Sequence, residues 1–414
     1  MKAVIIGGGI IGLSSAYYLL QDGWDVTVID KTDLTDSCSY GNLGMIVPSH
    51  FVPLAAPGIL AQGIRWMFNS RSPFYVKPSL NWQLIHWGLK FIRSANETNV
   101  KKAAHPLAAI NLLSKNLYED LSTQPGFDFA FEKKGIIMYY KTEKTGEEEI
   151  HMAETAKGMG LDVEVLSATQ AQALEPDVTL NVAGAVHYRC DAHLYPNKLN
   201  EQLIQYLKQK NVRFLTGHAV KKINRKANKI VSVETDAALE EGDLFVMAAG
   251  SWMPSLLQMA GLRLPLMPGK GYSFTQKNSQ PQLQIPAILC EARVAITPMG
   301  NDLRFGGTME IAPVNNQVNM KRVEGIVASV PEYLPGLKVT MPAKENIWYG
   351  FRPCSPDGLP YIGYGVKYEN LLYAGGHAMM GLSTGPATGK LIAELASHRS
   401  TTIDIKAFDP ARFD

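Results

Sequence analysis

Residues 2–30, KAVIIGGGIIGLSSAYYLLQDGWDVTVID, decide the fold of this chain. A β-branched run at 2–6 is followed by glycines and then by a pattern of helical period that continues to residue 20. A second β-branched run, at 26–29, ends at Asp30. This order predicts strand, tight turn, helix and strand, the beginning of a dinucleotide-binding α/β fold.

The glycines of this stretch have GxGxxG spacing at Gly7, Gly9 and Gly12. Gly7 permits the turn, Gly9 lets the backbone approach a pyrophosphate, and Gly12 lets the helix pack closely on the strand. The helix N-terminus favours the negative charge through its free N–H groups and its dipole. Asp30 is placed to accept hydrogen bonds from ribose hydroxyls, which favours NAD or FAD over NADP and does not separate those two.

Nucleotide-fold signals return late in the chain. DLFVMAAGSW at 243–252 and NLLYAGGHAMMGLSTGPATGKLIAELASH at 370–398 each read as a strand, a small-residue turn and a helix. An NAD enzyme usually completes its nucleotide fold in one contiguous half, so the late return favours FAD. We expect an α/β protein with a discontinuous Rossmann-like FAD-binding domain, a parallel sheet with flanking helices. We also expect a second domain, an inserted α+β substrate domain with a mostly antiparallel sheet. The expected boundaries are 1–50, 143–265 and 345–414 for the FAD-binding domain, and 51–142 and 266–344 for the substrate domain.

The composition narrows the class of protein. A length of 414 residues favours two domains over one core. The net charge of +2, without a run of basic residues, makes nucleic acid an unexpected partner. The four cysteines are scattered, with no CxxC pair, which predicts isolated thiols in a reducing compartment and no metal site. No apolar stretch reaches the roughly 18 residues of a membrane span, so we expect a cytoplasmic protein, or one peripheral at the inner face of the cytoplasmic membrane.

Further motifs extend over nearly the whole chain. In order they are GGGIIG at the start, SYGNLGMIVPSH, PLAAPG, IRWMF, DAHLYPNKL at 191–199, VMAAGSW, KGYSFT at 270–275, RFGG at 304–307, GFRPCSPDGLPYIG at 350–363 and YAGGHAMMGLSTGPATG. Together they resemble the glycine/D-amino acid oxidase family of flavoproteins, and within it most closely the bacterial D-amino acid dehydrogenases.

The resemblance implies the cofactor contacts. They lie at the glycine turn and Asp30, in the Ser39–Met45 loop under the flavin, at the adenine, and in the Gly376–Ser383 segment beside the isoalloxazine. The residues are Gly7, Gly9, Ile10, Ile11, Gly12, Asp30, Lys31, Ser39, Asn42, Leu43, Gly44, Met45, Val220, Ala249, Gly250, Gly376, His377, Met379, Met380, Gly381, Leu382 and Ser383. Some relatives of the resembled family attach flavin through a cysteine. Cys354 lies at a different sequence distance from the Pro-Asp pair than the cysteine of those relatives, so we expect noncovalent FAD.

Arg352 raises the question of its partner, because an ionised guanidinium among apolar neighbours costs several kcal/mol unless a counter-charge neutralises it. The resemblance implies that it receives the substrate carboxylate, a role that suits its rigid fork of donors. The alternative is an internal ion pair with Asp357. Tyr272, Tyr349 and His50 are further candidates for substrate contact, and we expect no acid or base side chain in the chemistry.

Residues 51–95 hold aromatic rings interleaved with basic residues. This pattern is typical of an interfacial membrane contact or a hydrophobic partner surface, and the alternative is a substrate lid whose aromatics are core. The dehydrogenases of the resembled family share the segment and pass electrons to a respiratory carrier. A quinone or another electron acceptor is therefore an expected partner, beside a small amino acid substrate.

These observations predict an FAD-dependent dehydrogenase of D-amino acids. Hydride would pass from Cα to flavin N5, giving an imino acid and then a 2-oxo acid plus ammonia. The alternatives are a dehydrogenase of cyclic D-amino acids such as D-proline or hydroxy-D-proline, an oxidase that uses oxygen, and an FAD-carrying subunit of a hetero-oligomer. Chirality rests on the resemblance alone.

Overall fold

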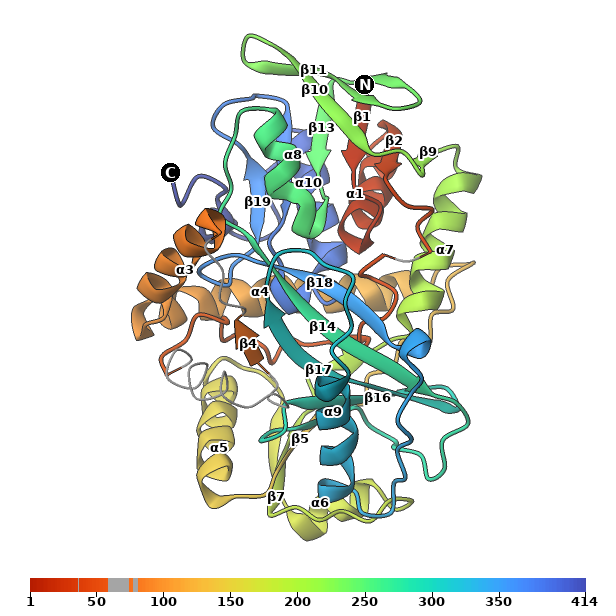
Figure 1. The fold of residues 1–414 in the computed structure, drawn as a ribbon, viewed down its shortest axis with the longest axis vertical. Helices are drawn as coiled ribbons and strands as arrows, with labels where there is room; N and C mark the ends of the chain where they lie inside the picture. Colours follow the sequence, from red (N-terminus) through yellow and green to blue (C-terminus); the bar gives the residue numbers. More distant parts are fainter. Residues whose placement is uncertain (36, 59–73, 77–80) are drawn as a thin grey trace.

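The architecture comes from a computed structural model, which describes residues 1–35, 37–58, 74–76 and 81–414. Two sheets dominate it (Figure 1), a parallel one in the upper half of the view and a larger one in the lower half. The helices are α1 (Ile10–Gln21), α3 (Trp82–Ser94), α4 (Glu97–Ser122), α5 (Glu143–Gly158), α6 (Ala168–Leu174), α7 (Pro196–Gln209), α8 (Met253–Met259), α9 (Met320–Tyr333) and α10 (Gly385–Ala396).

The six-stranded sheet confirms the expected nucleotide fold. Its spatial order is β19 (Tyr361–Tyr364), β20 (Leu371–Gly375), β13 (Leu244–Met247), β1 (Lys2–Ile6), β2 (Asp25–Asp30) and β9 (Arg213–Thr216). Every neighbouring pair is parallel except β19 with β20. Strands from the beginning, middle and end of the chain thus share one sheet, as the late return of nucleotide-fold signals predicted.

The nine-stranded sheet is the expected, mostly antiparallel one. Its order is β18 (Trp348–Cys354), β14 (Met267–Gln276), β17 (Asp302–Ile311), β16 (Val294–Met299), β15 (Ala287–Leu289), β5 (Ile136–Tyr140), β7 (Gly184–Tyr188) and β6 (Val163–Ser167), with β4 (Phe74–Val76) also on β17. Smaller sheets hold β10 (Val220–Lys226), β11 (Lys229–Thr235) and β12 (Leu239–Glu241), and the pair β3 (Met45–Ile46) with β8 (Ala192–His193).

The range 143–265 divides between the two sheets, which differs from the expectation that all of it joins the nucleotide fold. Strands β6 and β7 lie in the larger sheet, as does β18 near the start of 345–414. The succession β5, α5, β6 has the strand–helix–strand order of a nucleotide fold, but β7 inserts between the two strands and is antiparallel to both. Pairing with a later strand, which local sequence does not show, therefore decides where this segment belongs.

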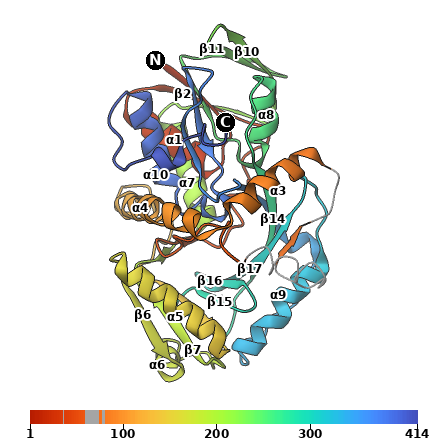
Figure 2. The same cartoon turned by 90° about the vertical axis from the view of Figure 1, so that its left-hand side faces the viewer.

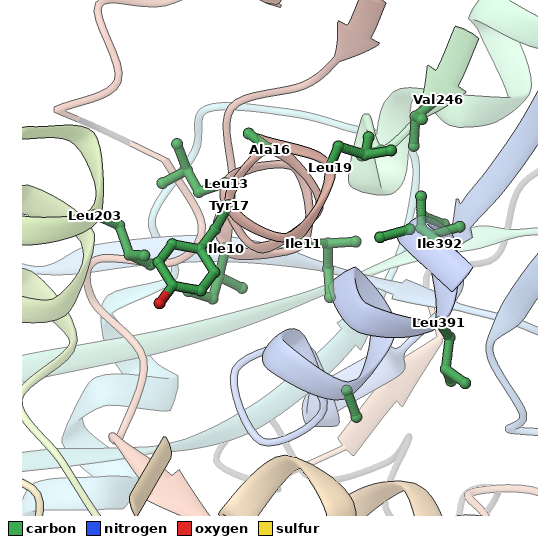
Figure 3. Close-up of a cluster of buried hydrophobic side chains, with 14 of the residues drawn as sticks. Ile10, Ile11, Leu13, Ala16, Tyr17, Leu19, Leu203, Val246, Leu391 and Ile392 are labelled. Carbon is green, nitrogen blue, oxygen red and sulfur yellow. The ribbon is translucent and has the colours of Figure 1, made fainter. Parts of the chain in front are cut away.

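Helix α1 is buried around most of its circumference and anchors the core of the parallel sheet. Figure 3 shows Leu13, Tyr17 and Leu19 of α1 beside Leu203, Val246, Leu391 and Ile392, which come from α7, β13 and α10. Each such side chain contributes about 1.5–3 kcal/mol when fully buried. The close approach of α1 and α10 depends on Gly389, where an added Cβ would lie 2.4 Å from the carbonyl carbon of Ser14.

We predict that Gly389→Ala lowers the free energy of unfolding by about 1–3 kcal/mol, because its methyl group meets backbone that has no room to yield. Gly158→Ala is the matched control, since an added Cβ at this helical glycine would contact nothing. The control should be neutral or stabilise by up to about 1 kcal/mol. Chemical denaturation of both variants measures the difference, and equal stabilities would contradict the packing argument.

Candidate active site

A cavity of about 1480 Å³ lies between the two sheets. One end borders the β1–α1 turn and Asp30, and the other borders β14, β17 and β18, including Arg352. Nearly all the residues expected to contact the cofactor line it: Gly7, Gly9, Ile10, Ile11, Asp30, Lys31, Ser39, Asn42, Leu43, Gly44, Met45, Val220, Ala249, Gly250, His377, Met379, Met380, Gly381 and Leu382. Arg352, Tyr272, Tyr349 and His50 line it too.

Three residues expected at the cofactor do not line the cavity but lie behind its wall: Gly12, Gly376 and Ser383. An added Cβ at Gly12 would lie 1.8 Å from the carbonyl oxygen of Gly7, and one at Gly376 would lie 2.6 Å from the ring of Tyr361. The Ser383 hydroxyl accepts from the Val47 N–H at 2.8 Å and donates to Asn111. These three residues shape the cavity through close packing and do not face into it.

The nucleotide end has the geometry that a dinucleotide requires. Gly7 has φ +113°, and an added Cβ would lie 2.4 Å from the Ala248 carbonyl oxygen, so only glycine fits this turn. Helix α1 begins after Gly9, which faces the cavity and provides no side-chain cap. The Asp30 carboxylate is fixed by the N–H groups of Gly8 at 2.7 Å and Thr32 at 2.9 Å and still lines the cavity. The oxygen that accepts from Thr32 also accepts from the Thr32 hydroxyl at 2.9 Å, so the oxygen bound to Gly8 is the one that keeps a lone pair for a ribose hydroxyl.

The other end is a row of paired residues across the larger sheet. Tyr349 pairs with Tyr272, Tyr272 with Gly307, and Gly307 with Val294. Glycines interrupt these strands where the backbone forms the cavity floor, at Gly271, Gly306, Gly307 and Gly350. Glycine within a strand often marks a close approach of another group. Gly271 stands in KGYSFT, and Gly306 and Gly307 stand in RFGG, so the sequence contained this glycine signal. These glycines were not among the residues expected in the site.

Gly271 makes room for Arg352. An added Cβ at Gly271 would lie 2.2 Å from a terminal nitrogen of the Arg352 guanidinium, so the guanidinium lies flat across the neighbouring strand. Its Nη1 donates to the Thr308 carbonyl at 2.6 Å. Burial lowers the pKa of Arg352 from its usual value, yet a guanidinium keeps its proton under all ordinary conditions. The cavity wall therefore holds a permanent cation whose hydrogen-bond partner is a neutral carbonyl.

The alternative expectation, an internal ion pair between Arg352 and Asp357, is wrong. Asp357 accepts two hydrogen bonds from Arg412, at 2.7 Å to Nε and 3.1 Å to Nη2. Within residues 1–35, 37–58 and 81–414, no carboxylate lies within ion-pair distance of Arg352. The four remaining donors of its fork are thus available to an anion in the cavity.

The two tyrosines, candidates for substrate contact, both line the cavity. The Tyr272 hydroxyl accepts from the Asn319 N–H at 3.3 Å and lies 3.5 Å from Glu310, so it is turned toward the segment before α9. The Tyr349 ring lies 4.6 Å from the ammonium of buried Lys270. Lys270 in turn donates to Asn315. Both tyrosines line the cavity, but their best-defined contacts fasten its wall.

His50 is half-buried and lines the cavity, and its Nδ1 lies 3.1 Å from the Ser49 hydroxyl. Burial, assisted by the nearby charge of Arg293, lowers the pKa of His50 to about 4. The imidazole is therefore neutral at physiological pH. Cys354 is fully buried outside the cavity lining, and burial raises its pKa to about 12, which keeps the unreactive thiol form.

The comparisons with known proteins agree over the full length of the chain. The profile of the DAO family, described as FAD dependent oxidoreductase, matches residues 2–395. The chain belongs to this family. It is 30% identical over 397 residues to a D-amino acid dehydrogenase of Helicobacter pylori, covering 95% of this chain and 94% of that protein.

Solved structures show the same fold. A glycine oxidase from Geobacillus kaustophilus superposes with a TM-score of 0.78 at 22% identity, covering 100% of this chain and 99% of the other. An L-proline dehydrogenase from P. horikoshii superposes with a TM-score of 0.75 at 20% identity, covering 100% and 97%. The chain is an FAD-dependent oxidoreductase, and its fold is that of the glycine oxidase type.

The residues that line the cavity fit FAD. The glycine turn, the N-terminus of α1, where the Ile10 N–H donates to the Ser39 hydroxyl at 2.9 Å, and the hydrogen-bonded Asp30 suit the adenosine and pyrophosphate. The cavity continues from there to the glycine floor of the larger sheet, so it has the length that a flavin beyond the pyrophosphate needs. Among the described residues, no group of three or more histidine, cysteine or acidic side chains is arranged to hold a metal ion.

We predict that Gly271→Ala weakens the binding of propionate to the FAD-loaded protein by at least about tenfold, because the methyl group displaces the guanidinium of Arg352. The fold should survive, since the displaced atoms end a flexible side chain. Gly269→Ala is the control, two residues along β14, where an added Cβ meets Cys354 and apolar side chains. Titration followed by flavin absorbance measures both, and unchanged affinity in Gly271→Ala would contradict this placement of Arg352.

Proposed function

We propose that this chain is a D-amino acid dehydrogenase that holds FAD noncovalently. The observation that carries the proposal is Arg352, a cation in the wall of an FAD-family cavity with no carboxylate partner among the described residues. A substrate with a carboxylate supplies the missing charge. The relative named D-amino acid dehydrogenase, at 30% identity, supports the D-amino acid as the substrate class.

The reaction is a two-electron oxidation of the Cα–N bond. The amino acid gives up its Cα hydrogen with the electron pair and one proton from nitrogen, and water then hydrolyses the imino acid to a 2-oxo acid and ammonia. FAD supplies the electron-accepting chemistry when bound. Arg352 binds the carboxylate through two parallel N–H donors, which fixes its orientation as well as its position. Such orientation supplies several kcal/mol of the barrier without a side chain acting as base.

Anaerobic mixing of the purified protein with D- and L-amino acids, including the proline and hydroxyproline isomers, tests the substrate class. Loss of the visible flavin absorbance with D-amino acids supports the proposal. Bleaching by the cyclic isomers alone would favour a cyclic D-amino acid dehydrogenase, and rapid reoxidation in air with hydrogen peroxide would favour an oxidase. A yellow protein that no amino acid bleaches would overturn the assignment and favour an FAD-carrying subunit.

We predict that Arg352→Lys raises KM by roughly 10-fold and Arg352→Met by more than about 100-fold, because lysine keeps the charge and loses the fork. Arg352→Met should leave the thermal midpoint unchanged or raise it, since it removes a partly desolvated cation that has no counter-charge. Arg412→Met is the contrasting variant, because it leaves Asp357 without its partner and should lower the midpoint. A similar loss of stability in Arg352→Met would show a structural ion pair instead.

The described part of the 51–95 segment has two apolar faces on α3. Leu84, Trp87 and Phe91 pack on the nine-stranded sheet, which agrees with the alternative that the aromatic rings of this segment are part of the core. The opposite face exposes Trp82, Ile85, Leu89 and Ile92, with Trp82 74% and Leu89 63% exposed. Residues 59–73 and 77–80 of the segment lie outside the described part of the chain.

The exposed face of α3 supports peripheral contact with an anionic membrane, where a quinone would accept the electrons. Its residues recur every three or four positions, which gives one stripe along the helix, and Arg93 lies in its last turn. No helix in the described residues is long and apolar enough to cross a bilayer, so the contact would be interfacial.

We predict that Leu89→Glu with Ile92→Glu reduces cosedimentation with phosphatidylglycerol vesicles at least about fivefold, because the stripe then carries charge into the apolar boundary. Val366→Glu is the control, since Val366 is 79% exposed and lies outside α3. Activity with a soluble artificial acceptor should be unaffected in all three proteins. Equal binding by both variants would exclude α3 as the membrane contact.

A further inference from the structure

A buried hydrogen-bonded series leads from Asp191 through Ser49 to His50. Asp191 is fully buried, and its carboxylate accepts from both the N–H of Ser49 at 2.9 Å and the hydroxyl of Ser49 at 2.5 Å. The same hydroxyl oxygen lies 3.1 Å from Nδ1 of His50. Asp191 follows β7 and Ser49 follows β3, so the series joins segments that are 142 residues apart.

The series sets the tautomer of His50. An ionised carboxylate only accepts hydrogen bonds, so the single proton of the Ser49 hydroxyl points to Asp191. The hydroxyl oxygen can then only accept from His50, and Nδ1 must carry the imidazole proton. Since the ring is neutral, Nε2 has a free lone pair, and no described residue donates to it.

His50 and Arg352 line the same cavity. Arg352 donates to the carbonyl of Thr308, and Thr308 directly follows Gly307, which pairs with Val294. Arg293, next to Val294, is the charged group that acts on His50. Both side chains therefore line a cavity whose wall also includes Gly307, Thr308 and Arg293.

We propose that Asp191 and Ser49 hold His50 in the tautomer whose Nε2 accepts a hydrogen bond from the amino group of the substrate. The inference rests on the proposed function. His50 would touch the substrate, whereas Asp191 and Ser49 are positioning residues. Arg352 then holds the carboxylate and His50 the nitrogen of the same molecule.

This arrangement favours the reactive form of the amine. A nitrogen lone pair must form the C=N bond, so the amine has to be neutral before it is oxidised. The positive charge of Arg293 disfavours an ammonium beside His50, whereas a neutral amine donates an N–H to Nε2 at no such cost. His50 takes no proton from the substrate in this scheme, in keeping with the expectation that no side chain acts as acid or base.

Asp191→Asn is the decisive variant because it should reverse the direction of the hydrogen bonds from residue 191 through Ser49 to His50. The Ser49 N–H needs the amide oxygen at its position, which leaves the amide NH₂ to donate to the Ser49 hydroxyl oxygen. That hydroxyl must then donate to Nδ1, and the imidazole proton moves to Nε2. A donor would face the substrate nitrogen where an acceptor is needed.

The expected result is a fall in kcat/KM for the amino acid of about 10- to 100-fold, with the affinity for propionate unchanged because Arg352 is untouched. At a pH well above 7, where Asp191 is ionised, nitrogen-15 spectra of histidine-labelled protein should show His50 protonated at Nδ1 in the wild type and at Nε2 in Asp191→Asn. Glu175→Gln is the matched control: Glu175 is also fully buried, accepts from Gln284 and Ile285 N–H groups, and lies outside the cavity lining. It should match the wild type in all three measurements.

The pH profile gives a second readout. Burial raises the pKa of Asp191 to about 7, against the lowering effect of its Ser49 bonds. Below that pH the protonated carboxyl can donate to Ser49, so kcat/KM of the wild type should fall as pH drops through about 7. The titratable neighbours are Lys115 of α4 and Cys190 beside Asp191, with Tyr188 at the end of β7. Asp191→Asn should lack this step, whereas titration of the substrate amine remains in both proteins.

Two outcomes would overturn the inference. One is a wild-type protein in which His50 is protonated at Nε2, and the other is an Asp191→Asn variant with the kcat/KM of the wild type. If the wild type oxidises no amino acid, the proposed function fails in the parent protein itself. The nitrogen-15 spectra still decide whether Asp191 sets the tautomer of His50.

Discussion

The structure depends on backbone contacts that leave no space for a side chain. The turn at Gly7 touches the backbone after β13, Gly12 touches Gly7, and Gly389 of α10 touches α1. These contacts draw the beginning, middle and end of the chain into one parallel sheet and place the N-terminus of α1 at the end of the cavity (Figure 2 shows α1 beside α10). A dinucleotide needs that exposed helix terminus, so the packing of the core and the binding of the cofactor are consequences of the same glycines.

Arg352 illustrates how a fold retains a cation for a ligand. Placing a guanidinium in a partly desolvated wall costs free energy, and the nearby Asp357 would be the simplest remedy. The chain instead commits Asp357 to Arg412, which lies 55 residues further on and comes from the last turn of the protein. Arg352 is left with a backbone carbonyl and with a glycine that accommodates its plane. Under the proposed function, a bound carboxylate would offset this destabilisation, and binding energy would be directed to the group that must be oriented.

The sequence was informative where contacts are local. The β1–α1–β2 unit, with Asp30 at its end, could be predicted because a 29-residue stretch contains the strands, the turn and the helix that pack on one another. The sheet of β6 and β7 could not, because it depends on pairing with β5 that only the folded chain shows. The partner of Asp357 was missed for the same reason, since Arg412 lies 55 residues away in sequence. The Asp191–Ser49–His50 series joins distant segments, so neighbouring letters gave no indication of it.

The fold alone does not decide the handedness of the substrate, because proteins named glycine oxidase and L-proline dehydrogenase share it. If Arg352 fixes the carboxylate and His50 the nitrogen, the hydrogen and the side chain are the two remaining substituents on Cα. The hydrogen has to face the flavin, so the enantiomer depends on where the cavity leaves room for the side chain. Met138 and Ile288, paired across β5 and β15, line an apolar part of the cavity that also includes Val52. With the side chain directed to one side, the same two anchors that orient the reacting bond would exclude the mirror image.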